Sequence, residues 1–105
     1  MAEITIPFKS MFRDALLTGV KVCTARKKRM GKPGDRFLAF DQPFEILSVE
    51  DVSLDDVARL WKDEGCTSRA HFIEVWNSIH PKVGYRETQR VYVHRFKKVL
   101  CMGMD

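Results

Sequence analysis

The sequence predicts an α+β fold in which helices flank a small, mixed, barrel-like β-sheet. The length of 105 residues suits one domain with one core, so we expect a single domain over residues 1–105. The composition, 45% hydrophobic and 30% charged, is typical of a globular chain. Short stretches that alternate apolar and polar residues enclose stretches with helical spacing, and they are too few for a β-sandwich.

The first quarter of the chain predicts strand, helix and strand. Alternation predicts a strand over residues 3–8, and Pro7 places this strand at an edge or an end of the sheet. Ser10 is suited to cap a short helix, and Gly19 is suited to end it. Residues 21–26 alternate again and are expected to be extended.

The middle and the end of the chain predict further strands. Glycine and proline predict a turn over residues 31–34. Residues 36–40 and 44–50 are predicted strands, joined by a turn at residues 41–43. The last predicted strand covers residues 91–96.

Two helices are predicted between these strands. Ser53, with an acid three residues later, resembles a capping arrangement, and Gly65 is suited to close the helix that follows. Thr67 or Ser68 is suited to cap the second helix, which Pro81 stops. The side chains expected to face inward are Leu54, Val57, Leu60, Trp61, Phe72, Ile73, Trp76 and Ile79.

The positive charge is concentrated in one loop. The formal net charge of +4 and the pI near 9.1 are too mildly basic to identify a nucleic-acid partner. Much of the excess falls between residues 26 and 36, which favours a polyanion at this loop; a solvated basic turn is the alternative. The residues expected to contact phosphates are Lys27, Lys28, Arg29 and Lys32.

The cysteines and the N-terminus favour a cytoplasmic protein. Three widely spaced cysteines suggest free thiols in a reducing compartment. The N-terminus lacks the basic and apolar regions of a signal peptide, and no apolar run reaches the roughly 20 residues that span a bilayer. The histidines and cysteines lack metal-ligand spacing, so neither a metal nor another cofactor is expected.

Lys21, Thr24 and Arg26 are candidates for a small polar site beside the basic loop. Positions three apart point to opposite faces of a regular strand. Lys21 and Thr24 therefore converge only if the backbone bends between them or if Lys21 lies in the turn after Gly19, which we favour. The alternative is that Lys21 is a solvated lysine and Thr24 an ordinary strand residue.

The chain resembles the ASCH domain, from Ile4 to Phe96. The resemblance implies a PUA-like β-barrel and binding of RNA. Some small bacterial ASCH proteins are amidohydrolases that remove the acetyl group from N(4)-acetylcytidine. The motifs that carry the resemblance are, in order, Gly19-x-Lys21-x-x-Thr24-x-Arg26, Lys32-Pro33-Gly34-Asp35-Arg36, Asp63-Glu64-Gly65, Phe72, Trp76 and His80-Pro81.

The resemblance assigns catalytic roles to Lys21, Thr24 and Glu64, with Asp63 or Glu74 as alternatives to Glu64. Thr24 would be the nucleophile, Lys21 the base, and Glu64 the acid or the residue that orients Lys21. A carboxylate beside Lys21 also favours its charged form, which opposes its use as a base.

Two functions follow, of which we rank binding slightly ahead. The first is a module that binds RNA or a modified nucleoside in a cleft beside the basic loop. The second is an amidohydrolase acting on N(4)-acetylcytidine or related acylated cytosine nucleosides. Tyr85, in a loop, is a further candidate to contact a base by stacking, although a packing role is the more common one for such a tyrosine.

Overall fold

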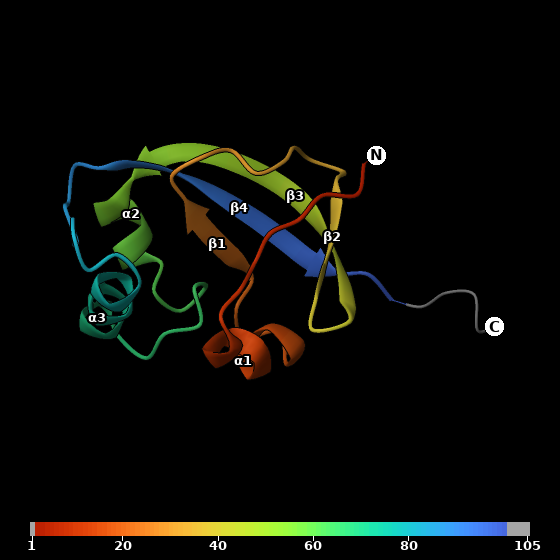
Figure 1. The fold of residues 1–105 in the computed structure, drawn as a ribbon, viewed down its shortest axis with the longest axis horizontal. Helices are drawn as coiled ribbons and strands as arrows, with labels where there is room; N and C mark the ends of the chain where they lie inside the picture. Colours follow the sequence, from red (N-terminus) through yellow and green to blue (C-terminus); the bar gives the residue numbers. More distant parts are fainter. Residues whose placement is uncertain (1, 101–105) are drawn as a thin grey trace.

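The computed structural model describes residues 2–100 and contains a curled four-stranded antiparallel sheet (Figure 1). The strand order is β1-β4-β3-β2, which places β1 and β2 at the edges. The long central strands pair along most of their length, and a register shift between Ile46 and Ser48 marks a bulge in β3. The strands are β1 (Cys23–Arg26), β2 (Arg36–Ala39), β3 (Gln42–Ser53) and β4 (Arg90–Lys98).

Short helices flank this sheet. A 3₁₀ turn, η1 (Ser10–Phe12), leads into α1 (Arg13–Leu17); α2 (Leu54–Arg59) and α3 (Arg69–Ile79) lie between β3 and β4 in the chain. The expected α+β architecture is therefore confirmed.

Two of the predicted helix caps are present and one is not. The Ser53 hydroxyl accepts a hydrogen bond from the Asp56 amide at 3.2 Å. Of the two candidates for α3, Ser68 is the cap, accepting from the His71 amide at 3.0 Å. The prediction for Ser10 was wrong, because the 3₁₀ turn already begins there and its N-cap, Lys9, makes no side-chain cap bond.

The prediction of a strand over residues 3–8 was also wrong. The segment makes one parallel bridge with β2, in which the Ile4 amide donates to the Arg36 carbonyl and the Arg36 amide donates to the Ala2 carbonyl, both at 2.8 Å. It then crosses the sheet toward β1, where the Arg26 guanidinium donates to the Pro7 carbonyl at 2.7 Å (Figure 1). The N-terminal segment, residues 2–9, thus contacts both edge strands.

The hairpin between β2 and β3 is tighter than predicted. Its two turn residues, Phe40 and Asp41, have φ values of 53° and 66°, and Ala39 pairs directly with Gln42. Two positive φ values are typical of a two-residue turn that matches the twist of the strands. Pro43, placed in the turn by sequence, instead lies in β3.

The sheet packs two hydrophobic clusters, and alternate residues of β4 belong to each. Val91 and Val93 pack with α2, α3 and β1, whereas Phe96 packs with β2, β3, α1 and the N-terminal segment. Phe96 meets Phe37 and Phe44 edge-on, with ring centroids 5.5 and 5.4 Å apart. The first cluster includes Cys23 and Ala25 of β1, whose outer side carries the cavity described next.

Candidate functional site

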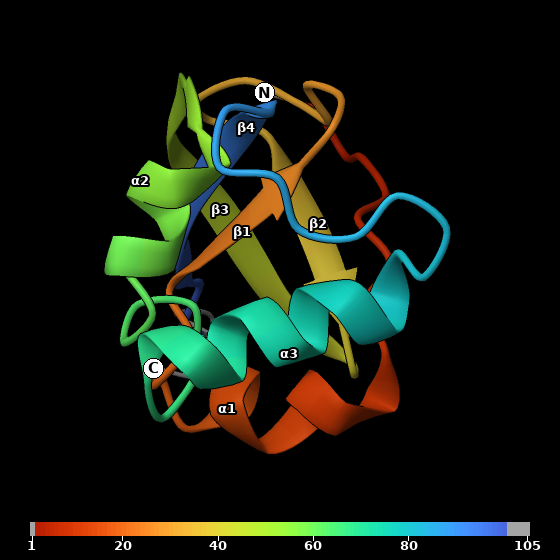
Figure 2. The ribbon, with the colours of Figure 1, turned by 90° about the vertical axis from the view of Figure 1, so that its left-hand side faces the viewer.

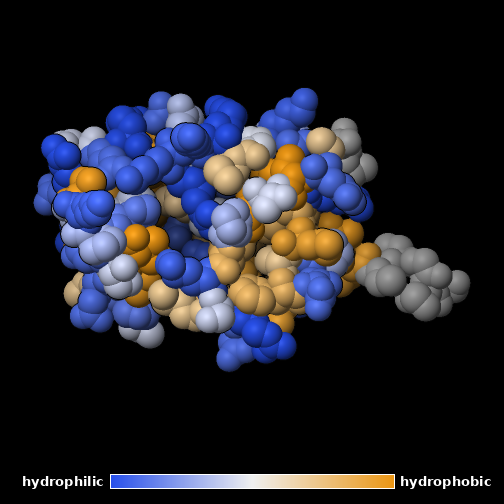
Figure 3. Space-filling view, viewed as in Figure 1, coloured by the Kyte–Doolittle hydropathy of each residue, from blue (hydrophilic) through white to orange (hydrophobic). Residues whose placement is uncertain are grey.

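A cavity of about 360 Å³ lies at the outer side of the edge strand β1. Helix α3 and the η1–α1 segment both lie below β1 in Figures 1 and 2, and both contribute to the lining. The space-filling view shows the surface hollowed between α3 and the N-terminal segment, with hydrophilic atoms at the bottom (Figure 3). The volume is within the range of small-ligand pockets. The lining includes Phe8, Lys21, Thr24, Ala25, Arg26, Glu64, Trp76 and His80.

A buried ion pair forms part of this lining. Lys21 Nζ lies 2.9 Å from Glu64 Oε1 and also donates to the Glu64 carbonyl at 3.0 Å. The two side chains are only 3% and 6% exposed. The Cys23 thiol donates to Glu64 Oε2 at 3.3 Å, so both carboxylate oxygens have a partner.

Glu64, among the three acids considered from sequence, is the buried one. Asp63 instead pairs with Arg95 at 3.1 Å and is partly exposed, and Glu74 is exposed. The predicted helix, closed by Gly65, had placed Glu64 in its last turn. Helix α2 instead ends at Arg59, so Glu64 lies in the turns that follow the helix.

The backbone around Lys21 confirms that this lysine lies in the turn after Gly19. The Lys21 amide donates to the Ala15 carbonyl at 2.9 Å, and strand β1 begins two residues later, at Cys23. The Val22 amide donates to the Asp63 carbonyl at 2.8 Å, which holds the segment carrying Glu64 against this turn.

Gly65 is required for this close approach. Its φ is +85°, and a Cβ placed there would lie 3.0 Å from the Cβ of Lys21 and 3.3 Å from that of Ala15. We expect Gly65→Ala to lower the free energy of unfolding for two reasons. An alanine in the left-handed backbone conformation costs about 1–2 kcal/mol, and its Cβ must also displace the neighbouring side chains, which costs more. Gly19→Ala, with φ +82° and no atom within 4 Å, is the matched control for backbone strain alone. Urea denaturation of both variants measures the difference; equal losses would contradict the steric term.

Thr24 and Arg26 interact with each other in the wall of the cavity. The Thr24 hydroxyl accepts from Arg26 Nε at 3.1 Å, which leaves its own proton free to be donated. The Arg26 guanidinium also stacks 4.9 Å from the Phe8 ring, and burial lowers its pKa. Between Thr24 and the pair of Lys21 and Glu64 the structure shows no hydrogen bond over residues 2–100.

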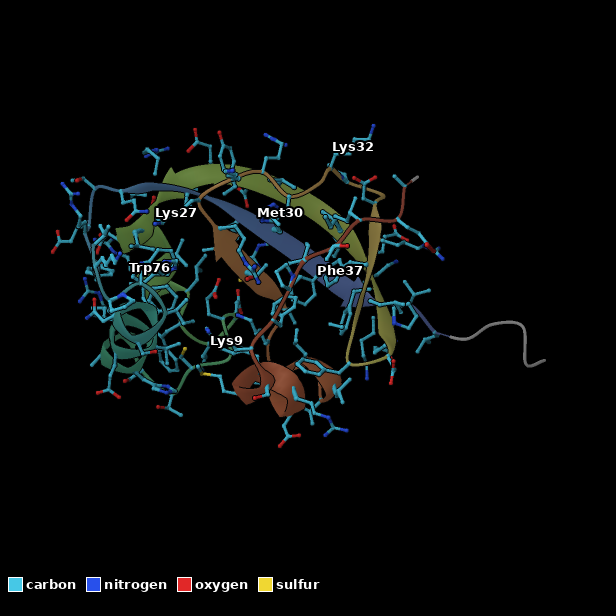
Figure 4. The ribbon with its side chains drawn as sticks, in the orientation of Figure 1. Lys9, Lys27, Met30, Lys32, Phe37 and Trp76 are labelled. Carbon is cyan, nitrogen blue, oxygen red and sulfur yellow. The ribbon has the colours of Figure 1, made fainter. Side chains whose placement is uncertain are left out.

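The aromatic wall of the cavity was not predicted. Trp76 and His80 pack with their ring centroids 4.3 Å apart. Burial, and then the charges of Lys27, Arg26 and Lys9, lower the pKa of His80. Lys9 and Arg26 line the cavity together with His80. Figure 4 shows Trp76 and Lys9 on either side of this region. Helical spacing predicted that Trp76 belongs to the core. Trp76 also lines the cavity, and spacing alone does not distinguish a core residue from one that lines a cavity.

The basic loop lies along β1 and β4 with its cations in solvent. Lys27, Lys28, Arg29 and Lys32 are all exposed. Figure 4 shows Lys27 on the side of Trp76 and Lys32 far along the loop. Arg29 stacks on Tyr92 with its guanidinium carbon 5.4 Å from the ring centroid. The four charges therefore form an extended row, of which Lys27 lies nearest the cavity.

Tyr85 does not line the cavity. Its hydroxyl accepts from Arg69 at 3.3 Å, and its ring packs against the cluster between the sheet and α3. Tyr85 thus packs within the fold and lies outside the lining of the cavity.

Residues 2–100 contain neither a cluster of metal-ligating side chains nor a helix suited to span a membrane. No group of three or more His, Cys, Asp or Glu side chains in this range is placed to hold a metal ion. Nor does any helix of this range have the length and apolarity to cross a membrane. Cys23 and Cys66 are free and buried, and burial raises the pKa of both thiols. Cys101 lies outside the described residues.

Comparison with known proteins identifies the fold. No protein-family model matches this chain, and no curated protein matches its sequence. The ASCH domain from Lactobacillus crispatus JV V101 is similar over 92% of this chain and 79% of its own, with a TM-score of 0.61 and 18% identity. The hypothetical protein PH0355 is similar over 93% and 98%, with a TM-score of 0.66 and 15% identity. These likenesses and the curled sheet with its flanking helices show that this chain has the fold of an ASCH domain.

Proposed function

We propose that the β1 cavity binds a single nucleobase or nucleoside, either free or within an RNA strand. The observation that carries this proposal is the convergence of flat aromatic walls and polar side chains on one cavity of about 360 Å³. Recognition of RNA sequence commonly uses unstacked bases that are held against aromatic or guanidinium planes and hydrogen-bonded at their edges.

The lining offers both kinds of contact. Trp76 and Phe8 supply ring faces, and Arg26 already stacks on Phe8. Thr24 can donate its free hydroxyl proton, while the ammonium of Lys21 keeps a donor beyond its two bonds to Glu64. A heterocycle with several acceptors would satisfy these groups.

The cations favour a ligand that carries phosphate. Lys9 and Arg26 line the cavity, Lys27 follows Arg26 in the chain, and the basic loop continues the positive row away from the cavity. A free nucleoside has no phosphate for these charges to contact. The ASCH fold also supports RNA as the partner, because ASCH domains are generally regarded as RNA-binding modules.

RNA binding is expected to weaken steeply with salt and to depend on the basic loop. If the four loop cations each contact one phosphate of a single strand, the slope of log K against log salt is about −3. Replacing Lys27, Lys28 and Arg29 by alanine should reduce the steepness of that slope by about 2. Fluorescence anisotropy with a labelled oligonucleotide at several salt concentrations measures both quantities.

The matched control is a triple alanine variant of Arg59, Lys62 and Lys97, which carries the same loss of charge on exposed residues outside the cavity lining. It should retain most of the slope. Equal effects of the two triple variants would mean that net charge, and not the loop, attracts RNA.

A second candidate function is hydrolysis of an acetylated cytosine nucleoside, favoured by the Lys21–Glu64 pair and the Thr24 hydroxyl in one cavity. With the shared proton on Glu64, uncharged Lys21 would accept the Thr24 proton as the oxygen attacks the acetyl carbonyl. Glu64 would then protonate the leaving N4 amine. Water would hydrolyse the threonine ester, releasing acetic acid. The structure has Lys21 bonded to Glu64, so attack requires Thr24 and Lys21 to move into contact.

Incubation with N(4)-acetylcytidine, followed by chromatography of cytidine, tests this candidate. Thr24→Val removes the hydroxyl at nearly constant shape and is expected to abolish release of cytidine, whereas Thr24→Ser should retain part of it. No cytidine from the unaltered protein, or an unchanged rate in Thr24→Val, would rule out this mechanism and leave the binding proposal standing.

A further inference from the structure

We propose that the free main-chain edge of β1 at Ala25 reads the hydrogen-bonding edge of the bound base. The cavity would then select a flat heterocycle in which an acceptor and a donor are adjacent, as in the amide edge of uracil or the amidine edge of cytosine. This inference rests on the proposed binding of a base and specifies the part of the base that is recognised.

The pairing of β1 with β4 fixes which peptide groups are free. The Phe96 amide donates to the Val22 carbonyl at 3.0 Å, so this pair is of the hydrogen-bonded kind. In an antiparallel ladder the hydrogen-bonded pairs alternate with pairs that exchange no bond. Thr24, opposite His94, is therefore bonded to β4, while Ala25, opposite Val93, directs its N–H and C=O away from β4.

The side away from β4 is the side of the cavity. β1 is an edge strand with β4 as its neighbour in the sheet, and Ala25 lines the cavity with 9% of its surface exposed. Within residues 2–100, no side chain and no loop forms a hydrogen bond with the N–H or C=O of Ala25. This donor and acceptor at the cavity wall are therefore available to a partner from outside the chain.

The surroundings favour a flat ring as that partner. Trp76 approaches β1 from the side of α3, and Phe8 approaches from the N-terminal segment. A ring inserted between them lies along the plane of the sheet and presents its edge to Ala25, where another strand would otherwise present a peptide group. Uracil and cytosine carry the same adjacent donor and acceptor as a peptide, on a ring that fits about 360 Å³.

Ligands methylated on or away from that edge test the inference in the unaltered protein. Isothermal titration calorimetry compares uridine with 3-methyluridine and 5-methyluridine, and cytidine with N4,N4-dimethylcytidine and 5-methylcytidine. For the pyrimidine that binds, the methyl groups on the edge should weaken affinity at least tenfold, whereas the 5-methyl group should change it by less than threefold. Equal binding of the edge-blocked ligand would overturn the inference and leave the base-binding proposal intact. Failure of every pyrimidine and of RNA to bind would overturn both.

A main-chain substitution provides the second test. Ala25→Pro removes an N–H that takes no part in the ladder, a position where an edge strand tolerates proline. It should weaken binding of the preferred nucleoside at least tenfold relative to the unaltered protein. A folded Ala25→Pro protein with unchanged affinity would overturn the inference. If this variant does not fold, the comparison of methylated ligands decides the matter.

Discussion

Replacing Glu64 with alanine is expected to lower the free energy of unfolding by about 3–5 kcal/mol. The Lys21 ammonium would be left without its counter-charge at a site where its side chain is 3% exposed. Removing one member of a buried pair is costly because the other charge remains out of water, and the Phe12 ring, 4.8 Å from Lys21 Nζ, compensates little. Urea denaturation followed by circular dichroism measures the loss.

Two variants separate this effect from a general sensitivity of the segment. Asp63 directly precedes Glu64 and forms a partly exposed ion pair with Arg95. Asp63→Ala breaks this pair and should lower the free energy of unfolding by less than about 1 kcal/mol. The double variant Lys21→Met, Glu64→Leu removes both charges and should recover most of the stability lost by Glu64→Ala. A double variant as unstable as Glu64→Ala would show that packing, and not the unpaired charge, dominates.

Replacing His94 with leucine should cost about 2 kcal/mol at neutral pH, because a buried donor and a buried acceptor lose their partner. The ring is 0% exposed and joins the basic loop to β1. Its Nε2 accepts from the Met30 amide at 2.9 Å, which leaves the proton on Nδ1, 3.4 Å from the Thr24 carbonyl. The neutral ring therefore holds the loop onto the sheet.

The same contact predicts how stability depends on pH. Burial lowers the pKa of His94 below its ordinary value of 6.5, although the carbonyls of Thr24 and Tyr92 oppose the shift. The unfolded chain then binds a proton at a higher pH than the folded chain does. The contribution of His94 is fully present above the unfolded value, and it is lost as pH falls from about 6.5 through the folded value.

Denaturant titrations between pH 7.5 and 5 test this dependence. The unaltered protein should lose stability over this range, and His94→Leu should lose less. His80→Gln is the control. Burial also lowers the pKa of His80, but this ring lies in the cavity wall and is more exposed than that of His94. The variant should therefore retain most of the dependence of stability on pH. An unchanged slope in His94→Leu would assign the pH dependence to other groups.

Features with a local physical cause could be predicted from sequence. Ser53 and Ser68 cap helices because their hydroxyls meet a nearby amide, and Gly19 adopts the positive φ that ends α1. The placement of Lys21 after the end of the helix could be predicted because Gly19 favours the turn that precedes it. The hairpin was misplaced because Phe40 adopts a positive φ value, which is uncommon for a bulky residue.

Features that depend on tertiary contacts could not be predicted. Alternation over residues 3–8 resembled a strand, but the segment leaves β2 after one bridge to cross the sheet. Trp76 has the spacing of a core residue, and only the tertiary placement of α3 and the N-terminal segment makes Trp76 and Phe8 walls of one cavity. The burial of Glu64 likewise depends on turns whose path the sequence does not specify.

The N-terminal segment has a protective consequence. Its main-chain bonds with Arg36 occupy part of the outer edge of β2, where a strand from another molecule could otherwise pair. At β1 it contacts the Arg26 side chain through the Pro7 carbonyl, which leaves the main-chain edge at Ala25 open. An open sheet of this kind would otherwise be prone to polymerise edge to edge. One short, irregular stretch of chain thus limits strand pairing along β2 while leaving room beside β1 for a small ligand.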